Sequence, residues 1–290
     1  MSTRGAGLWK LGVVAGCVIG AVMIVALVMA PADTAGPCTV LSGPIMLPEI
    51  PEASGLAISR RTPGLIWSHN DSGNAEILFA LDAAGNLRGR VRVPARARDW
   101  EDVSAAPCGS GACLYIADIG DNGLTRRRIR IYRVPEPAPT DADTATPEVF
   151  DATYADGPHN AEAMFVIGEG LFIITRDRVG GLYRSNPASP ASAGALTFQR
   201  IGQLGLEAVT DAEASPDQSR VVVRTSREAL VYQSKELTGG QARPSVRIPI
   251  ARLREPQGEG VALDDDSTLY VASEGGPLNR AGRFFRLRCS

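Results

Sequence analysis

Five short stretches share one pattern and decide the fold: ASGLAIS (53–59), WEDVSAA (100–106), AEAMFVI (161–167), TDAEASP (210–216) and GEGVALD (258–264). When their second residues are aligned, the column has spacings of 47, 61, 49 and 48 residues and reads Ser54, Glu101, Glu162, Asp211 and Glu259. Four of these five residues are acidic, and a small or acidic residue follows each one. A repeat at a period near 50 predicts a fold built from repeated structural units.

Each unit continues with further apolar runs that have the character of β-strands. A second run follows within about 10–14 residues, a third often joins an aromatic to a basic residue, as in RFFRL (283–287), and most units have a fourth. Alternating side chains and many β-branched or aromatic residues favour strands. Four strands per unit at this period predict an all-β protein, a β-propeller of five four-stranded blades over residues 38–290. Six blades with one degenerate unit is the alternative, but residues 135–147, rich in Pro, Thr and Asp, are interpreted as a loop.

The fifth unit has only three strands before the chain ends, so its fourth strand is expected from the other end of the domain. The strand-like stretch CTVLSGPIMLP (38–48) precedes the first aligned motif and can close the ring. Closure removes the exposed edge strands of an open ring. A disulfide between Cys38 and Cys289 then links neighbouring strands, and Cys108 with Cys113 flanks a tight GSGA hairpin. Free buried cysteines are the other interpretation.

The N-terminal segment, residues 1–37, is predicted to be separate from the propeller. Arg4 and Lys10 precede 20 uncharged residues, 11–30, which is long enough to span a membrane as a helix. Cations before such a helix keep the N-terminus in the cytoplasm and place the rest of the chain outside. A cleaved signal peptide is the alternative, because residues 30–32 read Ala-Pro-Ala, an A-x-A site. Either way the domain is expected to be extracytoplasmic, membrane-anchored or secreted.

Propeller geometry predicts where the polar residues meet. The start of the first strand and the end of the second strand of every blade lie around one mouth of the central channel. The acids of the aligned column lie at the first position, and polar clusters such as HNDSGN (69–74) and DIGDN (118–122) at the second. Two residues before the column, further polar side chains are expected to point the same way along the first strand: Glu52, Asp99, Asn160 and Gln257. The candidates for substrate binding at this mouth are Asp71, Asp121, Asn122, Arg176 and Arg224.

The acids need a cation, arginine partners or shared protons, because neighbouring carboxylates cannot all be ionised cheaply. Carboxylate and amide oxygens beside a glycine turn suit Ca²⁺, whereas two histidines in the whole chain make an imidazole-rich site a poor match. The alternative is structural, because Asp and Asn after a strand are ordinary turn formers. His69 and His159 lie at the predicted mouth and are the candidate general bases.

The composition and the missing motifs exclude several classes of function. A net charge of −2 leaves no electrostatic footprint for nucleic acid. The chain has no G-x-S-x-G elbow, no P-loop and no H-E-x-x-H sequence, so a serine-triad hydrolase and a nucleotide-dependent enzyme find no support.

Several motifs resemble those of a largely uncharacterised family of secreted bacterial β-propeller proteins: WSHNDSGN (67–74), DWEDVS (99–104), YIADIGDN (115–122) and NAEAMFV (160–166). More distantly, the acidic mouth is similar to calcium-dependent propeller hydrolases of the gluconolactonase and paraoxonase type and to propeller phytases. That resemblance implies a Ca²⁺ held by carboxylates and an amide, which in this chain would be Glu101, Glu162, Glu259, Asn70 and Asp118. Ser54 departs from it, since the first aligned position has no acid.

Two functions follow as hypotheses. The first is a metal-dependent hydrolase of a small ester, lactone or phosphate. The second is a non-catalytic propeller scaffold that binds a protein or a cell-envelope ligand, in which a metal would stabilise the fold without turnover.

Overall fold

The computed structural model describes residues 34–35, 37–186, 195–241, 243–278 and 280–290, which belong to one compact unit. The predicted N-terminal segment lies outside these residues, except for Thr34, Ala35 and Pro37. Within the described ranges, no helix is both long and apolar enough to cross a membrane. The described part of the chain is all-β, as the sequence predicts, with only one short helix, α1 (Ser234–Thr238), and one 3-10 turn, η2 (Ala251–Leu253).

The described strands form four sheets, in each of which the strands are named from one edge to the other. The first is β1 (Thr34–Ala35), β2 (Cys38–Leu47), β22 (Gly282–Cys289), β21 (Thr268–Glu274) and β20 (Gln257–Leu263). The second is β10 (Ala142–Asp143), β6 (Leu87–Arg92), β5 (Ile77–Asp82), β4 (Leu65–Asn70) and β3 (Ala53–Ile58). The third is β12 (Ala161–Ile167), β13 (Gly170–Thr175), β14 (Gly181–Asn186), β15 (Leu196–Gln203), β11 (Glu148–Tyr154), β9 (Ile129–Pro135), β8 (Gly111–Asp118) and β7 (Trp100–Cys108). The fourth is β16 (Val209–Ala214), β17 (Arg220–Thr225), β18 (Glu228–Gln233) and β19 (Val246–Pro249).

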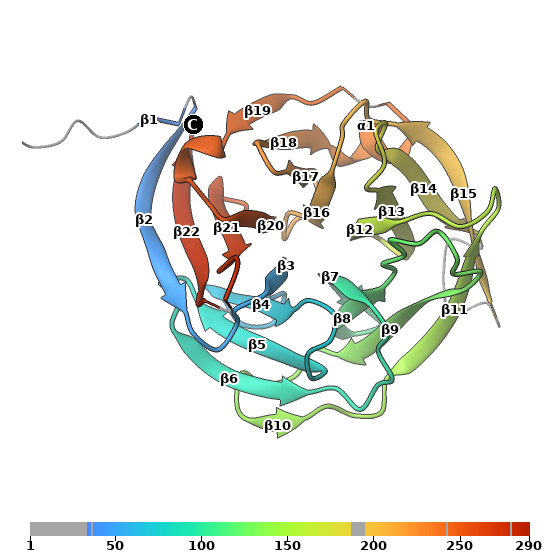
Figure 1. The fold of residues 1–290 in the computed structure, drawn as a ribbon, viewed down its shortest axis with the longest axis horizontal. Coiled ribbons are helices and arrows are strands. Elements are labelled where there is room, and N and C mark those ends of the chain that lie inside the picture. The colour runs from blue at the N-terminus through green and yellow to red at the C-terminus, as the bar shows by residue number, and fades with distance from the viewer. Residues whose placement is uncertain (1–33, 36, 187–194, 242, 279) are drawn as a thin grey trace, which may run out of the picture. The chain divides into compact units, whose positions relative to one another are not determined.

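The sheets stand around a common centre in a propeller-like ring (Figure 1), and the five aligned motifs form the strands nearest that centre. These are β3, β7, β12, β16 and β20, and each contacts the next around the ring, with β20 returning to β3. The eight-stranded third sheet consists of two antiparallel halves that join where β11 pairs in parallel with β15.

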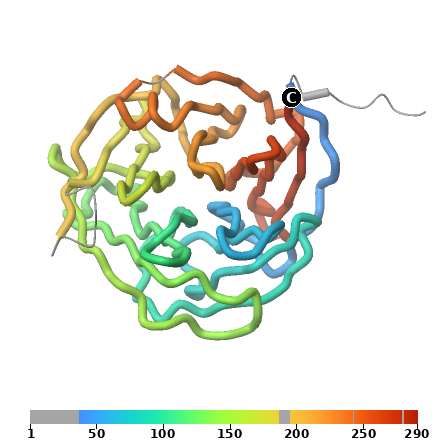
Figure 2. Tube along the Cα trace, turned by 180° about the vertical axis from the view of Figure 1, so that it is seen from behind, coloured from blue at the N-terminus to red at the C-terminus, as the bar shows by residue number. Residues whose placement is uncertain are grey.

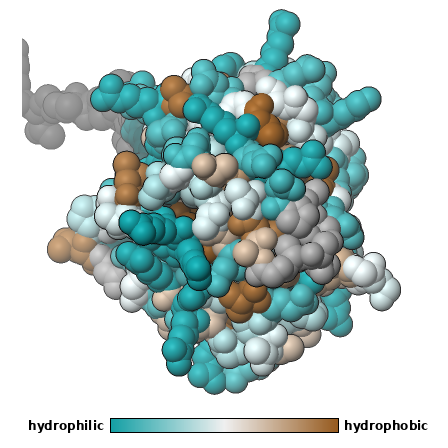
Figure 3. All heavy atoms as spheres, turned by 90° about the vertical axis from the view of Figure 1, so that its right-hand side faces the viewer, coloured by the Kyte–Doolittle hydropathy of each residue, from teal (hydrophilic) through white to brown (hydrophobic). Residues whose placement is uncertain are grey.

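The ring is held together by apolar side chains between neighbouring sheets. One core cluster, for example, joins Trp67 of β4 to Val103 of β7 and Ile116 of β8. The innermost strands are buried along most of their length because sheets cover them on both sides. Polar and charged residues are unusual in such strands, so those that occur here need an explanation. Seen from the side that carries β11 and β15, the surface is largely hydrophilic with scattered apolar residues (Figure 3).

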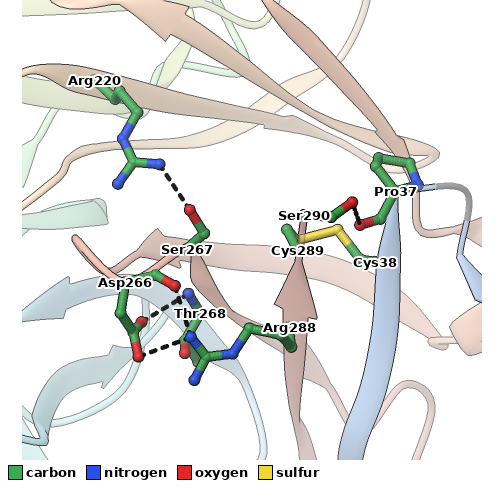
Figure 4. Close-up of a disulfide and its surroundings, with 9 residues drawn as sticks. All are labelled: Pro37, Cys38, Arg220, Asp266, Ser267, Thr268, Arg288, Cys289 and Ser290. Atoms are coloured by element: carbon green, nitrogen blue, oxygen red, sulfur yellow. Dashed lines mark hydrogen bonds and ion pairs between the residues drawn. A yellow bond between two sulfur atoms is a disulfide. The ribbon is translucent and has the colours of Figure 1, made fainter.

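The two ends of the described chain meet in one sheet. β2 pairs antiparallel with β22, so the N-terminal strand lies beside the C-terminal one (Figure 2). Cys38 faces Cys289 in this pairing and forms a disulfide with it over a sequence separation of 251 (Figure 4). Cys108 and Cys113 form the second disulfide. Both predicted pairings are confirmed, and such bonds are typical of proteins that fold in oxidising compartments.

The segment predicted as a plain loop contains one short strand. β10, only two residues long, pairs in parallel with β6 at the outer edge of the second sheet. Arg92 forms an ion pair with Asp143 there at 2.9 Å. The segment therefore covers the edge of a sheet, which the sequence alone did not indicate.

Candidate cation site

Each innermost strand has a local irregularity in its pairing near its first residues. The antiparallel register shifts near Ser54 in β3, at Glu101 in β7, at Glu162 in β12, at Thr210 in β16 and near Glu259 in β20. A β-bulge places two residues opposite one and turns a side chain out of the regular alternation. At this end, four of the five strands therefore present a side chain that the pleat would otherwise bury between sheets: Ser54, Glu101, Glu162 and Glu259.

A polar cavity of about 260 Å³ lies at this end of the strands. We call it the mouth pocket; it is lined by Ser54, Asp71, Ser72, Asp99, Glu101, Asn122, Glu162, Arg176, Gln257 and Glu259. Every lining residue is polar, and five of the ten are acids that face a single cation, Arg176. Such a pocket is built for a charged or strongly hydrated ligand rather than for an apolar one.

Three of the acids form a tight group. One carboxylate oxygen from each of Asp71, Asp99 and Glu101 lies within 4.8 Å of the other two. Glu101 is only 5% exposed, and no described residue donates a hydrogen bond to its carboxylate. Burial raises the pKa of Glu101 well above its usual value, and the negative charges of Asp71 and Asp99 raise it further. Burial likewise raises the pKa of Asp71.

The negative charge of the remaining pocket acids, Glu162 and Glu259, is neutralised only in part. Arg176, at the end of β13, forms an ion pair with Glu162, so this acid already has a partner. Glu259 is buried, and burial raises its pKa above the usual range. Beside it, Gln257 donates a hydrogen bond of 2.7 Å to Glu274. Burial and the charge of Glu259 raise the pKa of Glu274 to about 7.

Glycine at position 120 makes the acidic group possible. A Cβ atom there would collide with the carboxylates of Asp99 and Glu101, and the Gly120 N–H donates to the carbonyl of Asp99 at 3.3 Å. Any side chain at this position would push the two acids apart. The glycine between the aspartates of DIGDN therefore lets a loop backbone lie against the acidic group.

The mouth pocket brings together six of the ten residues predicted as candidates for metal or substrate binding. Those that line it are Glu101, Glu162, Glu259, Asp71, Asn122 and Arg176. Asp99, noted in the sequence only as pointing the same way, belongs to the tight acidic group. The sequence feature that points to Asp99 is strand alternation, because a residue two positions before Glu101 faces the same side.

The other predicted ligands do not line the mouth pocket. Asn70 uses its side-chain oxygen to accept the N–H of Glu52 at 3.0 Å. Asp118 is fully buried and forms an ion pair with Arg126 at 2.8 Å. Asp121 accepts the backbone N–H groups of Thr125 and Arg126. These three side chains shape the loops around the pocket.

Arg224 and both histidines also lie apart from the pocket lining. Arg224 is fully buried and donates to the carbonyls of Gly260 and Ala272. His69 is fully buried against Trp100, and burial lowers its pKa to about 4, so it is neutral near pH 7. His159 lies 2.9 Å from Asp156 and 2.8 Å from the Tyr183 hydroxyl, in a cluster of its own.

The structure corrects the aligned column by one residue in the fourth unit. The bulge falls at Thr210, and its hydroxyl donates to the carbonyl of Glu259, as Ser54 donates to the carbonyl of Glu101. Asp211 is the following residue, fully buried, and accepts the N–H groups of Leu56 and Val261. It ties innermost strands together and does not line the mouth pocket.

The resemblance of this chain to known proteins is one of structure only. No protein-family model and no curated protein sequence matches the chain. A gluconolactonase from Xanthomonas campestris is similar with a TM-score of 0.49 and 10% identity, over 89% of this chain and 92% of that one. Hydrazine synthase from Kuenenia stuttgartiensis is similar with a TM-score of 0.39 and 11% identity, over 80% and 58%.

Proposed function

We propose that the mouth pocket binds a divalent cation, preferably Ca²⁺, through Asp71, Asp99 and Glu101. The observation that carries this proposal is the Glu101 carboxylate, which is buried beside two other acids and receives no hydrogen bond from the described residues. A buried carboxylate without a partner is costly. A cation relieves that cost for Glu101 and offsets the repulsion among all three carboxylates, of which Asp71 and Asp99 are half-buried.

The donor set fits a hard cation. Ca²⁺ takes six to eight oxygen ligands from carboxylates, amides, carbonyls and water. The pocket offers carboxylates with hydroxyl and amide oxygens from Ser54, Ser72 and Asn122, and its lining contains neither histidine nor cysteine. Softer metals prefer those missing ligands.

We further propose that the protein is a hydrolase of a small polar ester, lactone or phosphate. A cation in this position supplies Lewis-acid polarisation of a carbonyl or phosphoryl oxygen. Arg176 orients a polar substrate group from the pocket wall, and Glu259, whose pKa is raised by burial, accepts a proton from a pocket water. The small polar cavity disfavours large apolar substrates.

We also propose five blades and an extracytoplasmic location. The blades are β3–β6; β7–β9 with β11; β12–β15; β16–β19; and β20–β22 with β2, each antiparallel and each led by one innermost strand. The two disulfides support an oxidising compartment. The N-terminal run of 20 uncharged residues either anchors the domain in the membrane or is removed on secretion.

Thermal unfolding with Ca²⁺ and with EDTA tests the cation. A ligand at 100 times its Kd stabilises the fold by about 2.7 kcal/mol, so Ca²⁺ should raise the Tm of the wild type. Glu101→Gln should abolish the shift, whereas Glu169→Gln, in an exposed turn, should keep it. An equal Tm in both solutions rejects the cation site.

Turnover separates the enzyme from the scaffold. Purified protein with Ca²⁺ is assayed on a sugar lactone, an aryl ester and a phosphate monoester, each with the Glu101→Gln variant as the blank. Hydrolysis that disappears in this variant supports the hydrolase. Calcium binding without turnover on any of the three supports instead a scaffold for a protein or cell-envelope ligand.

A further inference from the structure

Asp118, at the end of β8, contacts the segment that carries Asp99 without lining the mouth pocket. Its carboxylate accepts the backbone N–H of Arg98 at 3.2 Å and that of Asp99 at 3.0 Å. It also accepts from the guanidinium of Arg126 at 2.8 Å. The two backbone bonds fix the conformation of the chain just before β7, and therefore the direction from which Asp99 enters the pocket.

Arg126 holds a second backbone segment that contacts the same acidic group. Its guanidinium donates to the carbonyl of Gly120 at 2.7 Å and to the carbonyl of Asp118 at 3.1 Å. Gly120 in turn lies against the carboxylates of Asp99 and Glu101. Asp118 thus holds the backbone of Asp99, and Arg126 holds the backbone of Gly120, against which the Asp99 carboxylate lies.

The pair is buried, so its two members depend on each other. The side chains of Arg126 and Asp118 are only 4% and 1% exposed. Removing one charge from such a pair leaves the other unpaired in a poorly solvated place. Because Arg126 is matched to Asp118 and lies outside the pocket lining, it holds the acidic group without neutralising it.

We propose that Asp118 and Arg126 are positioning residues that orient the Asp99 carboxylate and thereby set the affinity of the mouth pocket for its cation. The inference rests on the proposed cation site. Residues that orient metal ligands from behind typically change metal affinity by 10- to 100-fold when they are replaced.

The test is a double-mutant cycle on cation affinity. Ca²⁺ binding is measured by calorimetry for the wild type, Asp118→Asn, Asp99→Asn and the double variant. Asp118→Asn should weaken binding by about 10- to 100-fold in the wild-type background and by less than about twofold once Asp99 is already replaced. An equal loss in both backgrounds, or no loss in either, overturns the inference.

A spectroscopic measurement separates positioning from general destabilisation. Tb³⁺ is bound in place of Ca²⁺, and its luminescence lifetimes in H₂O and D₂O give the number of coordinated waters. Asp118→Asn should add about one water, because the displaced Asp99 no longer fills its coordination position. An unchanged water count in a variant with weakened affinity contradicts positioning.

A matched control and a second variant complete the design. Asp151→Asn removes the partner of Arg130 in an exposed ion pair on β9 and β11, and should leave cation affinity unchanged. If Asp118→Asn does not fold, Arg126→Lys, which keeps the charge but loses the forked contacts, takes its place in the same cycle. A wild type that binds no cation refutes the proposed function itself, whereas a binding wild type with unaffected variants refutes this inference alone.

Discussion

Asp211 should make the protein less stable as the pH rises from acidic to neutral. It is fully buried on β16, and its carboxylate accepts the N–H groups of Leu56 and Val261 from two neighbouring innermost strands. Burial raises its pKa to about 7, and Asp102 nearby is also buried with a raised pKa. A carboxyl whose pKa is higher in the folded than in the unfolded state stabilises the fold fully below the unfolded pKa. That contribution is lost as the pH rises through the folded pKa.

The size of the effect follows from the shift. An unfolded aspartate has a pKa near 3.9, so a shift of about 3 units corresponds to about 4 kcal/mol of unfolding free energy. More than half of this should be lost between pH 5 and pH 8. Asp211→Asn removes the titration while its amide oxygen still accepts both N–H groups.

Urea unfolding in EDTA at pH 5 and pH 8 measures the effect. The wild type should lose about 2 to 3 kcal/mol more between the two pH values than Asp211→Asn loses. Asp217→Asn, in the turn between β16 and β17, is the control, because the Ser215 hydroxyl lowers the pKa of Asp217 to about 2. Its stabilisation is complete at both pH values, so this variant should keep the wild-type pH dependence. Equal pH dependence in the wild type and Asp211→Asn would refute the reasoning.

Two further predictions concern the loop glycine and the ring closure. Gly120→Ala should weaken Ca²⁺ binding more than tenfold in calorimetry, because the new Cβ atom displaces the carboxylates of Asp99 and Glu101. The control is Gly123→Ala, which should bind Ca²⁺ as the wild type does, because a Cβ atom there meets only Thr125, at 3.7 Å. Replacing both cysteines of the Cys38–Cys289 bond by serine should lower the unfolding free energy by about 5 kcal/mol, against about 2 kcal/mol for the Cys108–Cys113 bond, because the first closes a far longer loop. Equal losses for the two cysteine pairs in urea unfolding would contradict the loop-length argument.

The all-β ring could be predicted because its signals are local and repeated. Each unit has the alternation of strands, and five units share a period that is unrelated to any single turn. The Cys38–Cys289 pair could be predicted because closing the ring brings these two residues together. The Cys108–Cys113 pair could be predicted because the two residues flank a tight hairpin. The short strand β10 could not be predicted, because its two residues carry no strand pattern of their own. They form a strand only by pairing with β6.

The candidate site was predicted less completely. The sequence indicates which acids begin the innermost strands, but it does not show where a bulge shifts the register, so Asp211 was aligned where Thr210 belongs. Nor does it show which acid already has a partner. Asp118 has the chemistry of a calcium ligand, yet Arg126, eight residues later, folds back and occupies it.

By itself, then, the sequence determined the repeating strands, the closure of the ring by its N-terminal strand and the end of the ring at which the acids gather. These depend on period, alternation and cysteine spacing, which can be read along one chain. Only the tertiary structure decided that Asp71, Asp99 and Glu101 form the acidic group, and that Asp118 and Asp211 serve as internal supports. The physical reason is that an acid becomes a cation ligand only where no neighbouring donor satisfies it, and those donors come from strands and loops far away in the sequence.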